Sequence, residues 1–459
     1  MKPNSYPPTT IIPWEAIVPR LLLPIYPPPE PLVPLERPSL PTKQRAVSFG
    51  APYTLSTHII PACYLRTGRF EPIPPAPAGN LSKEERARVQ ARYRHELRVE
   101  RGPMITDGHP KVLWNCLNRY VRKGINRSNG TGLTLFFAHA NGFPKEIWEP
   151  TLAALLSPTA DRLIDEVWCW EAVQHGDSSL LNRGSLSKYF DWSDNTRDIL
   201  NFFFNFLPTE THTTSLPLHL ARLSARESMH RQEAGFSSRK LMIVGHSYGG
   251  CTSTLATENY PHLVDSLVLI DPVIPKPFVT RDIFNEAEAK TDGLLLNSLV
   301  RRDTWKTRDE VLTSYLKNPF FRAWHPDVLK IYIEAGIYDT TDGEGNAVVK
   351  LKMPGIYESV VFAERTVGHE AWQGLPNVPE RIPIRWIVPD RSDADEFGPP
   401  GATAERCWVR PKNASNIKIA GAGHLIAQER PVEVGEDLRD FVLEVYSDLH
   451  RSAKVRANL

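Results

Sequence analysis

Gly245-His246-Ser247-Tyr248-Gly249 places a serine between two glycines, directly after an apolar run. A serine hydroxyl is a weak nucleophile at neutral pH unless a base accepts its proton. The Gly-x-Ser-x-Gly pattern at a strand-to-helix turn exposes such a serine, and larger side chains at the glycine positions would collide with the turn. The hydroxyl would lie at a helix N-terminus, where free N–H groups favour negative charge. We therefore predict that Ser247 is a catalytic nucleophile.

A base for this serine is predicted close to the C-terminal end of the chain. Gly421-Ala422-Gly423-His424-Leu425 follows the apolar run 415–420 and precedes a long helical pattern. The small residues ahead of the histidine allow its loop to pass across the edge of a sheet. We predict that His424 is the general base for Ser247.

Three aspartates are candidates for the acid that orients this base. Asp393 lies in the loop after the apolar run 382–388, with room for one helix before His424. Asp390 lies nearer to the end of the same run, and Asp271 directly follows the run 264–270. Asp393 is the first choice, and Asp271 and Asp390 are the alternatives.

An acyl-transfer site of this kind also needs two backbone N–H groups that bind the oxyanion. Tyr248 follows the nucleophile and supplies one of them. The other is predicted at Phe143, in the turn Asn141-Gly142-Phe143-Pro144 after the apolar run 133–139. The chemistry needs no metal ion and no organic cofactor.

Short apolar runs alternate with helical patterns and so position these residues. The predicted strands are 53–65, 133–139, 166–173, 241–245, 264–270, 382–388 and 415–420, and the predicted helices include 148–156, 194–207, 252–259 and 431–449. Such alternation implies crossover units and a mostly parallel sheet with helices on both faces, an α/β fold. Residues 208–238 are predicted to be an inserted loop.

The chain divides into four predicted parts. Residues 1–45 hold 13 of the 41 prolines and form a Pro-rich irregular arm. Residues 46–275 and 376–450 form the α/β core, residues 276–375 form a helical cap rich in aromatic side chains, and residues 451–459 form a C-terminal tail.

The amino-acid composition disfavours some classes of binding partner and of structural site. Lys and Arg number 54 against 53 Asp and Glu, so nothing global favours nucleic acid. The five cysteines are scattered and never spaced as CxxC, which disfavours a disulfide scaffold or a Cys-based zinc site. The apolar stretch 11–24 is short and is interrupted by prolines and charges, so we expect no transmembrane segment.

Several motifs together resemble a known family. HIIPACYLR (58–66), FAHANGFPKEIWEP (137–150), VGHSYGG (244–250), LVLIDPVI (267–274) and GAGHL (421–425) resemble the α/β-hydrolase superfamily. More narrowly, they are similar to fungal peroxisomal lipase-like proteins and hydrolases of host-selective toxin pathways. The resemblance implies an α/β-hydrolase fold with a helical cap, and in some members the acid occupies the position of Asp271.

These observations predict a serine hydrolase that cleaves a carboxylic ester, a thioester or a related acyl bond. The aromatic cap indicates an apolar acyl substrate. An acyltransferase would use the same triad, and a non-catalytic binding protein could use the same fold. Epoxide hydrolases and dehalogenases of this fold need a carboxylate at the position of Ser247, so the serine excludes that chemistry.

The C-terminal tail contains a motif that resembles a targeting signal. Ala457, Asn458 and Leu459 resemble the small-basic-leucine tripeptide read by the peroxisomal import receptor, with Asn458 in place of the basic residue. We expect a peroxisomal location, and a cytoplasmic location is the alternative.

Overall fold

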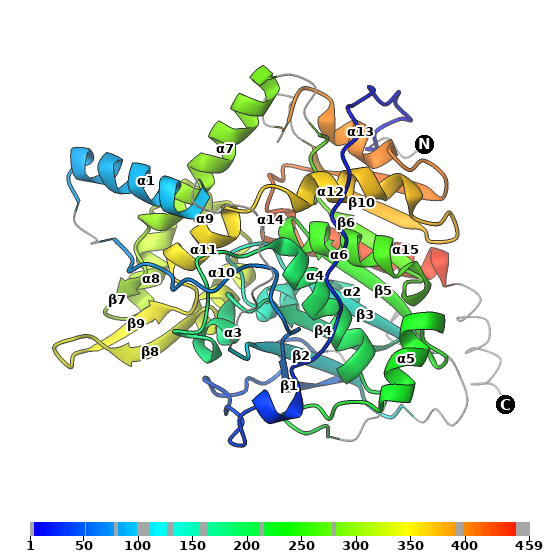
Figure 1. The fold of residues 1–459 in the computed structure, drawn as a ribbon, viewed down its shortest axis with the longest axis horizontal. Coiled ribbons are helices and arrows are strands. Elements are labelled where there is room, and N and C mark those ends of the chain that lie inside the picture. Colours follow the sequence, from blue (N-terminus) through cyan, green and yellow to red (C-terminus); the bar gives the residue numbers. More distant parts are fainter. Residues whose placement is uncertain are drawn as a thin grey trace.

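The computed structural model describes residues 4–50, 52–77, 81–98, 111–125, 132–156, 163–211, 215–277, 281–390, 396 and 398–446. Within these residues, a central sheet of eight strands has the order β1-β2-β4-β3-β5-β6-β10-β11 (Figure 1). The strands are β1 (Tyr53–Pro61), β2 (Trp114–Arg122), β3 (Gly132–Ala138), β4 (Ile164–Glu171), β5 (Arg239–His246), β6 (Ser266–Ile270), β10 (Ile384–Asp390) and β11 (Ala414–Ala420). The β1–β2 and β2–β4 pairs are antiparallel, and all the other pairs are parallel. The predicted fold class is confirmed.

Helices cover both faces of this sheet because alternate side chains of each strand point to opposite sides. Phe136 and Leu241 belong to one buried cluster, whereas Phe137 and Met242 belong to the other. The first cluster includes residues of α4 (Trp192–Asn201), α6 (Tyr248–Asn259) and α12 (Val367–Gly374). The second includes residues of α2 (Glu149–Leu155) and α15 (Pro431–Val445), which pack against each other.

Further helices precede β6 or follow β10 in the chain. They are α1 (Lys83–Arg98), α3 (Gly176–Leu181), α5 (Ala225–Ala234), α13 (Ala402–Trp408) and α14 (Ile426–Glu429). α5 lies in the segment 208–238, which was predicted to be a loop. Ser224 caps the helix by accepting a hydrogen bond from the Glu227 N–H at 3.2 Å. The predicted helix 194–207 begins earlier than expected, with Asp191 as its N-cap, and ends in a π-helical turn, Phe202–Phe206.

The cap between β6 and β10 is not wholly helical. It contains α7 (Arg281–Leu299), α8 (Arg308–Leu316), α9 (Pro319–Arg322), α10 (Pro326–Ala335) and α11 (Gly355–Phe362). It also contains a small antiparallel sheet of β7 (Thr304–Trp305), β9 (Ala347–Leu351) and β8 (Ile337–Thr341), which the sequence patterns did not predict. α12 lies within the predicted cap range but packs against α6, so this helix belongs to the layer over the sheet.

The Pro-rich arm lies across that same helical layer, as the dark blue trace in Figure 1 shows. The Tyr6 N–H donates to Asn416 Oδ1 of β11 at 2.7 Å, and Asn416 Nδ2 donates back to the Tyr6 carbonyl at 3.1 Å. Trp14 Nε1 donates to Gln373 Oε1 of α12 at 3.0 Å. The arm is therefore held largely by specific hydrogen bonds to side chains of the core, and an isolated antiparallel bridge between Tyr26 and Tyr64 adds backbone pairing.

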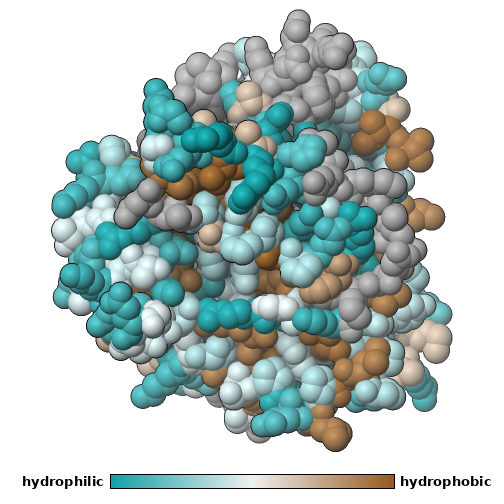
Figure 2. Space-filling model, turned by 60° about the vertical axis from the view of Figure 1, so that its left-hand side comes forward, coloured by the Kyte–Doolittle hydropathy of each residue, from teal (hydrophilic) through white to brown (hydrophobic). Residues whose placement is uncertain are grey.

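No helix of the described residues is both long and apolar enough to cross a membrane. On the face drawn in Figure 2, hydrophobic residues lie in several separate patches among hydrophilic ones. Some of the most exposed apolar side chains, such as Val18 at 94% and Leu21 at 93%, belong to the arm.

Arg20 provides a test of whether the arm stabilises the fold through its bonds to buried side chains of the core. Its Nε lies 2.6 Å from Glu370 Oε1 and its Nη1 lies 2.8 Å from Asp191 Oδ2, and both carboxylates are at most 5% exposed. Arg20→Ala leaves two buried carboxylates without this counter-charge, so we expect the free energy of unfolding in urea to fall by about 2–3 kcal/mol. Lys412→Ala removes an exposed ion pair with Glu380 and should cost less than about 1 kcal/mol. Equal losses of unfolding free energy in the two variants would contradict this stabilising role of the arm.

Candidate active site

Ser247 lies at a strained turn between β5 and α6. Its φ of 54° and ψ of −117° are rare for a residue with a side chain. The two glycines of the motif are required by close packing. A Cβ on Gly245 would lie 2.6 Å from the Gly249 carbonyl oxygen, and a Cβ on Gly249 would lie 2.4 Å from the Ala138 carbonyl oxygen. The turn therefore presses the start of α6 against the end of β3.

The predicted base lies beside this serine. His424 Nε2 is 2.9 Å from Ser247 Oγ, and its Nδ1 is 2.7 Å from Asp271 Oδ2. The loop that carries His424 begins at Gly421, whose φ is +67°. The structure thus brings together Ser247 and His424, two residues that are 177 positions apart in the chain.

His246 fixes the backbone of the histidine loop. Burial lowers the pKa of His246 to about 3, so its ring is neutral. Its Nε2 lies 2.9 Å from the His424 carbonyl oxygen, which can only accept, so we assign the proton of His246 to Nε2. Nearby, the Gly423 N–H donates to Glu429 Oε2 at 2.6 Å. The loop is therefore held on both sides of the imidazole.

Of the two candidate acids that the structure describes, Asp271 is the one that contacts His424. It follows β6, is 1% exposed and has a φ of +33°, so its backbone is strained like that of Ser247. Its other oxygen, Oδ1, accepts from Arg406 Nη2 at 2.9 Å. Asp390 instead pairs with Lys418 at 2.9 Å, and its side chain is 42% exposed. Asp393, the first choice from the sequence, lies outside the described residues.

The predicted oxyanion loop follows β3. Gly142 has a φ of +94°, and the Asn141 side chain receives a hydrogen bond from His175 Nε2 at 3.1 Å and donates to the Glu358 carbonyl at 3.2 Å. The Phe143 ring packs against Trp324 of the cap at 5.4 Å between centroids. Tyr248 is the first residue of α6, and the N–H groups of a first helical turn have no acceptor within the helix.

A buried group of charges supports this loop from behind. Lys145, in the 3-10 helix Lys145–Trp148, is fully buried, and its Nζ lies 2.7 Å from Asp177 Oδ2 and 3.1 Å from Glu146 Oε1. The Lys145 N–H also donates to Glu171 Oε1 at 3.1 Å. Lys352 Nζ, from the cap, lies 2.6 Å from Asp177 Oδ1. The ion cluster therefore ties the oxyanion loop, the end of β4, α3 and the cap together.

Burial and the neighbouring lysines shift the pKa values of the carboxylates in this ion cluster. Burial raises the pKa of Glu171 to about 7, although Lys145 opposes the shift. Burial also disfavours the charge of Asp177, but Lys145 and Lys352 outweigh it and hold its pKa below the ordinary value. Among the described residues, one group with metal-ligand atoms is Cys116, Glu171 and Asp177. The lysine ammonium groups lie against these carboxylates and compete with a cation for them.

The amino-acid sequence matches the model of the family described as "Alpha/beta hydrolase family" over residues 135–436. The chain belongs to the α/β-hydrolase family. The peroxisomal membrane protein LPX1 of Saccharomyces cerevisiae is 25% identical over 245 residues, which cover 49% of this chain and 54% of LPX1. The type I acyl-CoA thioesterase mpaH of Penicillium roqueforti is 23% identical over 277 residues, which cover 60% of this chain and 48% of mpaH. The chain thus spans about half the length of these curated relatives.

A solved structure shares the fold. The peroxisomal α/β-hydrolase Lpx1 of Saccharomyces cerevisiae aligns with a TM-score of 0.58 and 21% identity, covering 86% of this chain and 89% of that chain. The resemblance to fungal hydrolases that the sequence motifs indicated is therefore confirmed. The protein is an α/β hydrolase, and one of its relatives is named an acyl-CoA thioesterase.

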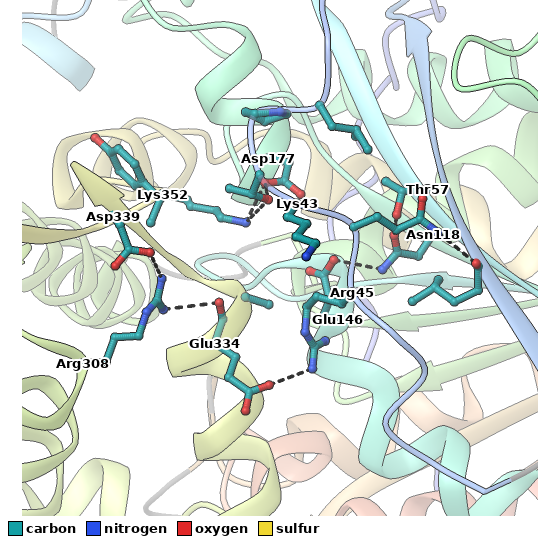
Figure 3. Close-up of a pocket in the computed structure, with 17 residues that line it drawn as sticks. Lys43, Arg45, Thr57, Asn118, Glu146, Asp177, Arg308, Glu334, Asp339 and Lys352 are labelled. Carbon is teal, nitrogen blue, oxygen red and sulfur yellow. Dashed lines mark hydrogen bonds and ion pairs between the residues drawn. The ribbon is translucent and has the colours of Figure 1, made fainter.

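The α/β hydrolase also has a cavity of about 330 Å³ between the arm, the β1–β2 edge and the cap (Figure 3). Its charged lining residues pair mainly with one another: Arg45 with Glu334, Arg308 with Asp339, and Lys352 with Asp177. Its lining residues are Leu40, Pro41, Thr42, Lys43, Gln44, Arg45, Leu55, Thr57, Asn118, Glu146, Asp177, Arg308, Glu334, Ala335, Tyr338, Asp339 and Lys352. Ser247, Asp271 and His424 do not line it, so this cavity is distinct from the candidate active site.

Sequence reasoning missed three supports of this site: Arg406, His246 and the ion cluster around Lys145. No local pattern marks Arg406, because its partner Asp271 is 135 positions away. His246 lies inside the motif, but its role depends on a loop that is distant in sequence. The sequence does show Lys145 directly after Gly142-Phe143-Pro144, but no local pattern indicates that its side chain is buried.

Gly249 provides a test of the turn geometry. Because a Cβ there would lie within 2.6 Å of backbone atoms of Ala138 and His139, we expect Gly249→Ala to lower the free energy of unfolding by about 3 kcal/mol. Gly293→Ala is the matched control, since Gly293 lies inside α7 with nothing within 4 Å of its added Cβ. This control should be neutral or stabilising by up to about 1 kcal/mol in the same urea titrations. A harmless Gly249→Ala would refute the proposed close packing.

Proposed function

We propose that this α/β hydrolase is a serine hydrolase that cleaves an ester, a thioester or a related acyl bond through an acyl-enzyme. The observation that carries the proposal is the hydrogen-bonded series Ser247–His424–Asp271, with distances of 2.9 and 2.7 Å. A nucleophile, a base and an orienting acid in this geometry are the components of a catalytic triad.

In the proposed reaction, Ser247 Oγ attacks the carbonyl carbon while His424 Nε2 accepts the hydroxyl proton. The carbonyl oxygen becomes an oxyanion, which the N–H groups of Phe143 and Tyr248 stabilise. When the carbon–oxygen or carbon–sulfur bond to the leaving group breaks, His424 returns the proton to that group. Water then attacks the acyl-Ser247 ester by the same route and releases the carboxylic acid and free Ser247.

Asp271 is the proposed acid. Its carboxylate receives the Nδ1–H of His424, which fixes the tautomer that leaves Nε2 free to accept the serine proton. The negative charge of Asp271 also stabilises the imidazolium that forms during attack. Asp390 is not favoured because it pairs with Lys418.

The substrate class follows from the walls of the site. Ser247 is only 6% exposed, and the His424 side chain is 24% exposed, so protein covers most of both side chains. The oxyanion loop packs against aromatic rings of the cap, since Phe143 lies 5.4 Å from Trp324 and 5.8 Å from Tyr332. Apolar walls favour an apolar acyl group. Because the relative mpaH is named an acyl-CoA thioesterase, an acyl-CoA thioester is the substrate to test first.

Turnover and active-site labelling test this proposal together. Ser247→Ala should lose at least 10³-fold in the hydrolysis of acyl p-nitrophenyl esters and acyl-CoA thioesters, and should not be labelled by a fluorophosphonate probe. Asp271→Asn should lose on the order of 10³–10⁴-fold, because an amide cannot stabilise the imidazolium. Asp390→Asn and Asp393→Asn are the controls and should stay within about tenfold of the wild type.

Other outcomes of these assays separate the alternatives. Wild-type turnover by folded Ser247→Ala would contradict the proposed mechanism. If Asp393→Asn is inactive and Asp271→Asn is active, the acid is Asp393 and not Asp271. Failure of the wild type to label or to turn over any acyl substrate would favour a binding protein. Preferential transfer of the acyl group to an added alcohol or amine, in place of water, would favour an acyltransferase.

We further propose a peroxisomal location. The support is the segment Ala457-Asn458-Leu459, which lies outside the described residues, and the name of the relative LPX1, a peroxisomal membrane protein. A fluorescent protein fused to the N-terminus should appear in puncta that coincide with a peroxisomal marker, and deletion of Ala457–Leu459 should make the signal diffuse. A diffuse signal from the intact fusion would favour the cytoplasm.

A further inference from the structure

Arg406 contacts the proposed acid on the oxygen that His424 does not use. Its Nη2 lies 2.9 Å from Asp271 Oδ1, whereas His424 Nδ1 lies 2.7 Å from Asp271 Oδ2. The Arg406 and Asp271 side chains are 5% and 2% exposed. A buried pair of this kind interacts strongly, because little solvent screens its charges. The carboxylate is therefore fixed at both ends, by a cation on one side and by the imidazole on the other.

We propose that Arg406 is a positioning residue whose positive charge, acting through Asp271, opposes protonation of His424 and so keeps the imidazole available as a base. The inference rests on the proposed function, since it assigns a role only if Ser247 and His424 react with a substrate. Arg406 touches neither Ser247 nor the substrate in this scheme, and it acts through Asp271 and through its own charge.

Counting charges gives the direction of the effect. With Arg406 present, neutral His424, ionised Asp271 and cationic Arg406 sum to zero, and protonation of His424 would create a net positive charge beside buried groups. Without the arginine, neutral His424 and ionised Asp271 sum to −1, and protonation of His424 would remove that charge. Buried groups favour the uncharged sum, so loss of Arg406 should make His424 take up its proton at a higher pH.

Other charged and titratable groups face this pair but do not differ between the variants. His246 of β5 approaches His424 and is neutral because burial lowers its pKa to about 3, and Glu429 of α14 interacts with His424 through space. Cys407 lies near Asp271 and Arg406, and burial raises the pKa of its thiol to about 12, so it is also neutral. Glu396 interacts with Cys407. The difference between wild type and an Arg406 variant therefore isolates the arginine charge.

Contacts on both sides of Arg406 hold α13 in place. Glu405 pairs with Lys276, which follows β6, and its Oε1 also accepts from the Ile12 N–H of the arm at 3.0 Å. Trp408 Nε1 donates to the carbonyl of Tyr6, another arm residue, at 3.2 Å. The arginine is thus presented to Asp271 by a helix that is bonded to the arm at two points.

The test measures how fast a fluorophosphonate probe labels Ser247 as a function of pH, in wild type, Arg406→Gln and Arg406→Lys. Glutamine keeps a hydrogen-bond donor for Asp271 but removes the charge, and lysine keeps the charge. We expect the acid limb of the labelling profile to move to higher pH by about one pH unit in Arg406→Gln. In Arg406→Lys the limb should stay near its wild-type position. Arg406→Met serves as a second neutral variant with the same expected shift.

Arg385→Gln is the matched control, because Arg385 of β10 forms a buried ion pair with Asp437 of α15 that does not involve the triad. It should lose stability in urea without moving the acid limb. Unshifted limbs in folded Arg406→Gln and Arg406→Met, with labelling reduced equally at every pH, would overturn the inference but leave the proposed function intact. A wild type that is not labelled at any pH would overturn both.

Discussion

The strained turn at Ser247 is the constraint on which the rest of the site depends. The close approach of Gly249 to the end of β3 leaves no room for a side chain, so α6 begins directly beside the loop that is proposed to bind the oxyanion. The Ser247 N–H donates to the Ile270 carbonyl at 3.0 Å, and the Ser247 carbonyl accepts from the Val273 N–H at 3.1 Å, so the turn is also bonded to the end of β6. Three neighbouring strands therefore end at one level, and Asp271, which follows β6, is carried to the serine by backbone geometry alone.

Charged side chains around this turn are buried together with partners of opposite charge. An unpaired charge in such a position would be costly, since a buried ion needs a partner and its remaining hydrogen bonds. Lys145 meets the carboxylates of Asp177, Glu146 and Glu171 behind the oxyanion loop, and Arg406 meets Asp271 behind the base. These pairs are weak arguments for overall stability, because apolar side chains could fill the same space. Their directional bonds do hold in place the Asp271 carboxylate and the loop that is proposed to bind the oxyanion, as the proposed reaction would require.

The sequence predicted the parallel part of the sheet because each of those strands is a short apolar run followed by a helical pattern. It did not predict β2, in which Asn115, Asn118 and Arg119 are all buried. Arg119 is tolerated there because Glu166 of β4 lies 2.8 Å away, and a partner 47 positions along the chain leaves no local signal. The same limit applies to the choice among the three aspartates: the contact between Asp271 and His424 depends on how β6 packs between β5 and β10, which no local pattern shows. The prediction of Ser247 as nucleophile and of His424 as base rested on the glycines in their own motifs, which the turn geometry imposes.

The arm joins these separate constraints. Chain entropy disfavours holding an irregular Pro-rich segment against a folded core, so its contacts must offset that ordering cost. They fall on side chains that also matter to the site: Glu405 lies next to Arg406, and Asp191 begins α4, whose Trp192 ring lies 5.0 Å from that of Tyr248, the residue after the nucleophile. An arm bonded at these points restricts α13 and α4 together. Because α13 carries Arg406, which contacts Asp271, and α4 packs against Tyr248, a segment remote from Ser247 in sequence limits how far both residues can move relative to Ser247.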